Sequence, residues 1–232
     1  MVNYKLKYML KSIKTSVLAA ILISTAVIAH AQKKVNEGVL TYGLTYELTA
    51  DQQSMASQLP AETKFKFSGN LFKIEMEQGP AKIAIISDGI QRTSLVLVDV
   101  PIAQKQFAVK SSKEETEQMM GATPVLSDFK PTGEKLKIGN YNTEKYTYKD
   151  DKGTPFEVWA THDIQLPEGI IGEEFKPLNA TPVKFTRVQN GVKAVVTIKD
   201  LTDEKVGALS LDVPSGYEVT TMEALKAMGG GQ

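Results

Sequence analysis

The chain lacks cysteine altogether, and it lacks an apolar run long enough to span a membrane. Without cysteine it has no disulfide, no thiolate metal ligand and no thiol to which a lipid could be attached. The apolar run near the N-terminus, from Val17 to Ile28, is well short of the roughly 20 residues that a membrane-spanning helix needs. We therefore expect a mature protein without a membrane span.

The first 31 residues have the three-part order of a secretory signal peptide. They begin with four lysines: Lys5, Lys7, Lys11 and Lys14. An uncharged segment from Ser16 to Ile28 follows, and Ala29 and Ala31 then place small residues where a signal peptidase needs them. A retained membrane anchor is the alternative, but the apolar run is too short for one. We predict cleavage after Ala31 and a periplasmic protein.

The charge balance argues against nucleic acid as a partner. The full chain has 27 basic and 27 acidic residues, and loss of four lysines with the signal peptide leaves 23 against 27, a net charge of −4. Nucleic acid is bound mainly by clustered lysine and arginine, which neutralise phosphates. The remaining residues suit a single domain over 32–228 and a flexible glycine-rich tail over 229–232.

Histidine is nearly absent as well. His30 lies in the predicted signal peptide, so the mature chain has one imidazole, at His162, for acid–base or metal chemistry. Its neighbour Asp163 is expected on the opposite face of an extended segment, which does not suit a catalytic pair. We therefore expect no metal site, and because no glycine-rich phosphate loop precedes a helix, no cofactor.

Three pairs of adjacent acids occur: Glu114 with Glu115, Asp150 with Asp151, and Glu173 with Glu174. Acids of this kind are typical of solvated turns and of the first turns of helices. A glycosidase instead needs two carboxyl groups that face each other across a cleft, and folding can bring distant acids together in that way. The sequence favours a protein that is not an enzyme, with a hydrolase kept as the third hypothesis.

Alternation of apolar and polar residues predicts many short strands. The clearest is Val39–Leu48, and Asn190-Gly191 gives the strongest hairpin turn. Further strands are expected at residues 64–67, 72–76, 82–87, 94–100, 105–109, 135–138, 144–149, 156–161, 183–189, 192–201 and 208–213. The run at 94–100 is nearly continuous in apolar residues, which predicts a strand covered on both faces.

Two capping boxes predict short helices. Ser112 with Glu115 predicts a helix over 113–120, and Thr220 with Glu223 predicts one near the C-terminus. Each box pairs a hydroxyl and a carboxylate with backbone N–H groups that the first helical turn leaves without partners.

Short strands joined by turns, without long helices between them, predict a mainly β fold. We expect a single curved antiparallel sheet or an incomplete β-barrel with two or three short helices. Residues 50–60 have near-helical apolar spacing, and residues 165–182, which are rich in glycine and proline, predict a long ordered loop.

Nine apolar residues lie on neighbouring predicted strands: Phe65, Phe67, Phe72, Ile74, Met76, Ile83, Ile85, Leu95 and Leu97. On a curved sheet such residues can line a cavity for a lipid-like ligand, and we assign ligand binding to all of them except Phe72 and Ile83. The alternative is that they form a filled core. Trp159, the sole tryptophan, is expected in the core rather than in a ligand platform.

Three short motifs in the second half carry a family resemblance: Ile138-Gly139-Asn140-Tyr141, Glu157-Val158-Trp159 with Thr161, and Val213-Pro214-Ser215-Gly216-Tyr217. They resemble an exported family of unknown function from Gram-negative bacteria. In architecture that family is similar to the periplasmic lipoprotein-sorting carriers, whose incomplete antiparallel barrel and helical lid enclose an apolar cavity for acyl chains. The resemblance implies a fold of this type and transfers no functional residue.

Our leading hypothesis is an exported, non-enzymatic protein that binds a lipid-like or other apolar ligand on a concave sheet face. The alternative is an envelope scaffold or protein-interaction domain with a solid core, which would act through an exposed apolar patch.

Export can be tested directly. We expect the protein recovered from the periplasm of its host to begin at Gln32, as read by N-terminal sequencing and intact mass. The substitution Ala31→Arg should block processing because the peptidase requires a small residue there. Lys33→Arg, which leaves the small residues in place, should be processed normally. Full-length protein retained in the membrane fraction would contradict the prediction.

Overall fold

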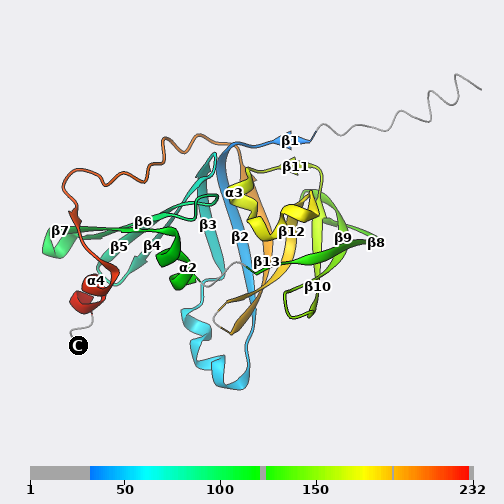
Figure 1. Cartoon of the computed structure of the whole chain (residues 1–232), viewed down its shortest axis with the longest axis horizontal. Helices are drawn as coiled ribbons and strands as arrows, with labels where there is room; N and C mark the ends of the chain where they lie inside the picture. The colour runs from blue at the N-terminus through cyan, green and yellow to red at the C-terminus, as the bar shows by residue number, and fades with distance from the viewer. Residues whose placement is uncertain (1–31, 121–123, 190, 230–232) are drawn as a thin grey trace, which may run out of the picture. The chain divides into compact units, whose positions relative to one another are not determined.

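The computed structural model describes residues 32–120, 124–189 and 191–229 (Figure 1). The predicted signal peptide, Asn190 of the predicted hairpin turn and residues 230–232 of the predicted tail lie outside the described residues. From Lys33 onward the described chain belongs to one compact unit.

Among the described residues, twelve strands form one sheet in the order β14-β7-β6-β5-β4-β3-β2-β13-β12-β10-β9-β8. Their bounds are β2 (Glu37–Glu47), β3 (Glu62–Ser68), β4 (Leu71–Gln78), β5 (Ala81–Asp88), β6 (Ser94–Val100), β7 (Lys105–Ser111), β8 (Ser127–Ile138), β9 (Tyr141–Lys149), β10 (Pro155–Thr161), β12 (Thr181–Gln189), β13 (Val192–Thr202) and β14 (Glu218–Val219). The sheet is not closed into a barrel, so the predicted mainly β class with an open sheet is confirmed.

The sheet is mixed rather than wholly antiparallel. Its neighbouring strands are antiparallel except at one edge, where β14 runs parallel to β7. A separate parallel pair joins β1 (Lys33–Lys34) to β11 (Ile164–Gln165). Parallel pairing needs a crossover connection, and in both cases the paired strands are far apart in the sequence. Alternation within a strand does not indicate which distant strand it pairs with.

The two faces of the large sheet differ because successive side chains of a strand point to opposite sides. We call the side that carries Leu40, Phe67 and Val96 the inner face, and the opposite side the outer face. Register links them: Leu40 on β2 lies opposite Phe65, and Phe67 on β3 lies opposite Phe72. The alternation predicted for these strands therefore produces one apolar face shared across the sheet.

The described helices are short, as predicted, but they outnumber the two or three that were expected. They are η1 (Ala50–Gln58), η2 (Pro101–Ala103), α2 (Lys113–Met120), α3 (Glu168–Ile171), η3 (Glu173–Leu178) and α4 (Met222–Gly229), the η segments being 3-10 helices. Helix α2 has the predicted bounds and the predicted capping box, since the Glu115 carboxylate accepts the Ser112 N–H at 2.7 Å and the Ser112 hydroxyl accepts the Glu115 N–H at 3.3 Å. The cap of α4 is Thr221, one residue later than predicted, and its hydroxyl accepts the Ala224 N–H at 3.2 Å.

Three segments differ from the prediction. Residues 208–213 were expected to form a strand, but they form no regular secondary structure. Residues 165–182, expected to be a loop, contain α3 and η3, and β8 begins at Ser127, well before the strand expected at 135–138. In each case tertiary packing, rather than local alternation, sets the backbone conformation.

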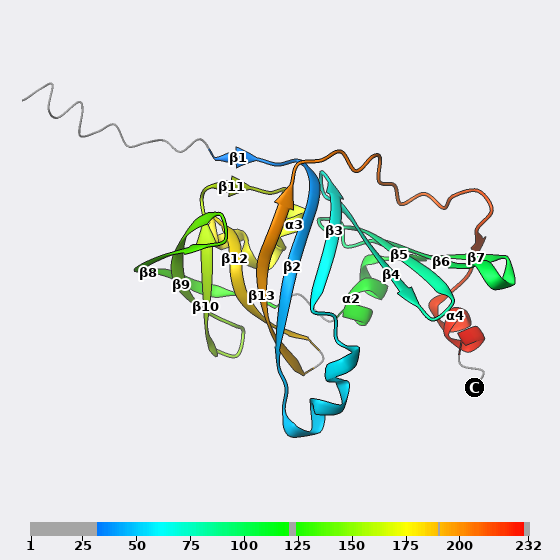
Figure 2. The ribbon, with the colours of Figure 1, turned by 180° about the vertical axis from the view of Figure 1, so that it is seen from behind.

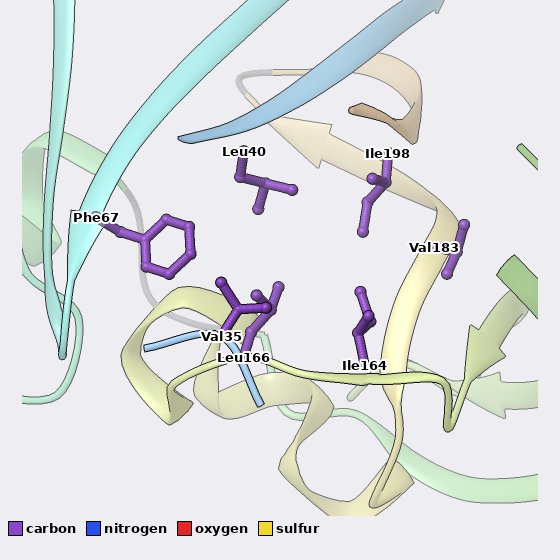
Figure 3. Close-up of a cluster of buried hydrophobic side chains, with 7 residues drawn as sticks. All are labelled: Val35, Leu40, Phe67, Ile164, Leu166, Val183 and Ile198. Carbon is purple, nitrogen blue, oxygen red and sulfur yellow. The ribbon is translucent and has the colours of Figure 1, made fainter. Parts of the chain in front are cut away.

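One half of the sheet bends around the segment that runs from β11 through α3 and η3 (Figure 1). Its core joins Val35 and the sheet residues Leu40, Phe67, Val183 and Ile198 to two residues of that segment. Figure 3 shows these two, Ile164 and Leu166, facing the sheet side chains. A second cluster buries Phe175 and Leu178 of η3 against Tyr148, Val158, Ala160 and Ala180. The chain's own residues therefore cover the part of this inner face that carries the two clusters.

The C-terminal part of the chain covers the other half of the sheet. Residues 203–217, which we call the C-terminal strap, cross the outer face, where Leu211, Val213 and Tyr217 pack against a cluster that includes Leu95. The strap is tied at its start, because the Glu37 carboxylate accepts the Val206 N–H at 2.9 Å. The chain then forms β14 and places α4 on the opposite, inner face (Figure 2).

One close approach depends on glycine. A Cβ added to Gly89, in the turn after β5, would lie 1.9 Å from the carbonyl oxygen of Gly169 in α3. The backbones can touch there because neither residue has a side chain. This contact fixes α3 against the β3–β4 and β5–β6 turns, since the Gly89 N–H also donates to the Asn70 carbonyl oxygen at 3.0 Å.

Phe67 provides a test of the core. Its side chain is fully buried, so Phe67→Ala should lower the free energy of unfolding by about 3–5 kcal/mol, through lost burial and the cavity left behind. Urea unfolding followed by circular dichroism measures the change. Met55→Ala, in η1 where the side chain is 42% exposed, should shift stability by less than about 0.5 kcal/mol. Equal effects would contradict this placement of the core.

Candidate functional site

The structure divides the seven predicted ligand-binding residues between the two faces of the sheet. Five of them lie on the inner face: Phe65, Phe67, Ile74, Met76 and Ile85. Leu95 and Leu97 lie on the outer face, because Leu95 pairs with Ile86 and Leu97 with Ala84, one position out of phase with Ile85. Leu95 is fully buried and Leu97 packs beside it under the C-terminal strap. These two leucines therefore do not share a surface with the other five.

Leu95 and Leu97 are separated from the other five residues because both faces of β6 are covered. Its inner residues Val96 and Val98 form a cluster that α4 covers, and its outer residue Leu95 lies under the strap. The prediction that the strand at 94–100 is covered on both faces is thus confirmed. A continuous apolar run does not show which of its residues belong to which face, so the register had to come from the structure.

Six partly exposed apolar residues form a continuous patch on the inner face, which we call the apolar strip: Phe65, Phe72, Ile74, Met76, Ile83 and Ile85. All six were among the nine apolar residues singled out from the sequence. The ring centroids of Phe65 and Phe72 are 5.9 Å apart, Ile74 lies opposite Ile85, and Met76 lies opposite Ile83. Met76 is 44% exposed. Phe67 is excluded from the strip because it is fully buried in the core.

Two helices lie on the same face as the strip (Figure 2). Helix α2 is attached near Ser94, whose hydroxyl is 3.5 Å from that of the buried Thr116. Helix α4 packs Met222 and Leu225 against the cluster of β6 and β7, which Ile83 and Ile85 also contact. The strip therefore lies between surfaces that the chain covers with its own helices.

A row of aromatic rings extends the strip across the sheet. Phe185 on β12 contacts Tyr42 on β2 at 6.3 Å between ring centroids, and Tyr42 contacts Phe65 on β3 at 5.5 Å. Both contacts are edge-to-face, the arrangement that aromatic pairs prefer. The row thus continues the strip from β4 towards β12, where Phe175 of η3 lies against Phe185 with ring centroids 4.9 Å apart.

The outer face has a groove of about 440 Å³ beside the strap. It is lined by Glu75, Met76, Glu77, Lys82, Ile83, Ala84, Leu97, Asp99 and Tyr217. Four of these nine residues are charged, so the groove is less suited to an acyl chain than the strip is. The carboxylate of Glu75 is already engaged by Lys66 at 2.6 Å and Lys73 at 2.8 Å, and these hydrogen bonds lower its pKa.

One end of the aromatic row carries charge. Burial raises the pKa of the Tyr42 phenol well above its ordinary value, while the nearby Arg187 guanidinium lowers it and the Glu174 carboxylate raises it further. Arg187 is exposed and Glu174 is half-buried. Sequence patterns could not predict this group, because Tyr42, Glu174 and Arg187 lie on three separate elements.

The catalytic candidates have local structural roles. His162 is exposed, and Asp163 accepts the backbone N–H of Asn142 at 2.7 Å and its side-chain amide at 3.1 Å. Asp150 accepts the N–H groups of Lys152 and Thr154 and so closes the β9–β10 turn. Within the described ranges, no three histidine, aspartate or glutamate side chains gather into a set that could hold a metal ion.

Trp159 lies on the outer face of β10 and is only partly buried, contrary to the expectation that it belongs to the core. The ammonium group of Lys145 lies 5.8 Å from the ring centroid, within cation–π range. Glu157 holds Lys145 in place at 2.9 Å. One face of the indole is therefore occupied by the chain's own lysine.

No family model matches the chain, and no curated protein matches it either. In the part of the chain that the structure describes, no helix combines the length and apolar character needed to cross a bilayer.

The buried Tyr148 predicts a pH dependence. Burial, and then the charges of Glu174 and Asp150, raise the pKa of its phenol to about 12, whereas an unfolded tyrosine ionises near about 10. The folded state therefore keeps its proton longer, so the stability that this group contributes is present below pH 10 and is lost as the pH rises towards 12. The free energy of unfolding should fall over that window, and less steeply in Tyr148→Phe. Equal slopes in urea unfolding would contradict the assignment.

Proposed function

We propose that the mature chain is an exported, non-enzymatic periplasmic protein that binds a lipid-like or other apolar ligand on the inner face of its sheet. The apolar strip carries this proposal. Solvent-exposed apolar residues are ordinary when scattered, but a continuous patch usually marks a binding surface. Here Phe65, Phe72, Ile74 and Met76 continue one another along two neighbouring strands.

The two helices beside the strip, α2 and α4, favour a narrow ligand. The buried Thr116 attaches α2 to the inner face, and Met222 and Leu225 attach α4 to it. A bound acyl chain would therefore have protein on its sides as well as the sheet beneath it, which increases the apolar area that binding removes from water. An open mainly β sheet with helices on its inner side also agrees with the proposed resemblance to the lipoprotein-sorting carriers.

One observation favours a second candidate, a protein-interaction or scaffold domain of the envelope. The bent half of the sheet is filled by Phe175, Leu178, Ile164 and Leu166, where a carrier would hold its ligand. The strip would then contact an apolar surface of another protein. The two candidates use the same residues, so the identity of what binds must distinguish them.

The first experiment is native mass spectrometry, with organic extraction, of the mature protein recovered from the periplasm of its own host. A co-purifying lipid or fatty acid is the expected result. A clean mass of the unliganded chain, with no lipid in the extract, would favour the protein-interaction domain.

A substitution test locates the ligand. The neutral dye N-phenyl-1-naphthylamine, which fluoresces in apolar surroundings, should bind the mature protein. Ile74→Ser should weaken that binding about fivefold or more, because it removes apolar contact from the middle of the strip. Val188→Ser, at a residue that is 56% exposed on the outer side of β12, should leave it unchanged. Equal losses in both variants would place the dye elsewhere.

A further inference from the structure

One charged residue lies on an otherwise uncharged surface. In the described parts of β12, β13, β2, β3 and β4, the register places Arg187 alone among charged residues on the inner face. It follows Phe185 by two positions on β12 and lies opposite Ala194. The other charged residues of these strands, such as Lys184 and Lys66, point outward.

Arg187 has no ion-pair partner among the residues that the structure describes. Glu174 is the nearby carboxylate, since both charges act on the Tyr42 phenol, yet the two do not form a salt bridge. The guanidinium is exposed, so an anion can approach it from solvent. A guanidinium presents a planar set of donors that matches a carboxylate or a phosphate.

The aromatic row connects this cation to the apolar strip. Phe185 contacts Tyr42, Tyr42 contacts Phe65, and Phe65 contacts Phe72, with ring centroids between 5.5 and 6.3 Å apart. In the sheet, β12 and β4 are separated by four inter-strand steps, or about 19 Å. Phe175 of η3 lies against Phe185 with ring centroids 4.9 Å apart, and the rings of the row are partly exposed. A cation beside partly exposed rings that lead to the strip fits a single-chain amphiphile with a negative head.

We propose that Arg187 binds the anionic head group of a single-chain amphiphile, such as a fatty acid, whose tail lies along the aromatic row and the apolar strip. This inference rests on the proposed function and names its ligand class. The alternative is a packing role, in which the aliphatic part of the arginine covers an aromatic ring and its charge stays in water. Head-group binding goes beyond that role.

The test compares two ligands that differ only in their heads. Dodecanoate and dodecan-1-ol are titrated separately against the mature protein loaded with N-phenyl-1-naphthylamine, and displacement of the dye is measured at low salt. Wild-type protein should prefer dodecanoate by about tenfold, because a charge-assisted hydrogen bond is formed only with the acid. Arg187→Gln should remove that preference and leave the affinity for the alcohol unchanged.

Two further variants serve as controls. Arg187→Lys keeps the positive charge and should retain part of the preference. Lys184→Gln removes an exposed cation from the outer face of the same strand and should retain all of it. Circular dichroism checks that each variant is folded.

The outcomes separate the inference from the function on which it rests. Equal displacement by the acid and the alcohol in the wild type, or a preference that survives in Arg187→Gln, would overturn the role of Arg187 while leaving apolar binding in place. Failure of the wild type to bind the dye or either ligand would overturn the proposed function and this inference with it.

Discussion

The packing of one chain segment into the bend of the sheet is the constraint on which the rest of the structure depends. Ile164 and Leu166 of this segment meet Phe67 and Leu40, and further along Phe175 is buried against Tyr148. A sheet this wide has an apolar inner face that must be removed from water, and a single sheet has no second sheet to cover it. The segment covers one half, and α4 covers part of the other. The apolar strip lies where these covers do not meet.

The two edges of the sheet are protected as well. Strand β8, at one edge, is largely exposed and carries lysines and Pro131, and its pairing with β9 shifts register between Pro131 and Lys135. Irregular, charged edges resist pairing with another sheet. At the other edge, β14 pairs with only Phe107 and Ala108 of β7. Both edges are therefore protected against pairing with another sheet.

The sequence predicted what depends on near neighbours and missed what depends on distant ones. Alternation located most strands, and the Ser112–Glu115 box located α2, because both signals are complete within a few residues. The face taken by Leu95 depended on the strap, more than 100 residues later in the chain. The helices of 165–182 also depended on contacts with distant strands. Of the candidate site, the apolar residues were predicted, but neither their division between faces nor Arg187 was.

The placement of charged residues supports the proposed binding role. Asp150, Glu115 and Asp163 accept backbone N–H groups at turns and at a helix start, so their positions serve the fold. Arg187 has no such role: it makes no ion pair within the described chain, and it stands at the end of a row of aromatic rings. A lone cation beside apolar side chains complements an amphiphile, because the cation can bind the negative head and the apolar side chains can contact the tail.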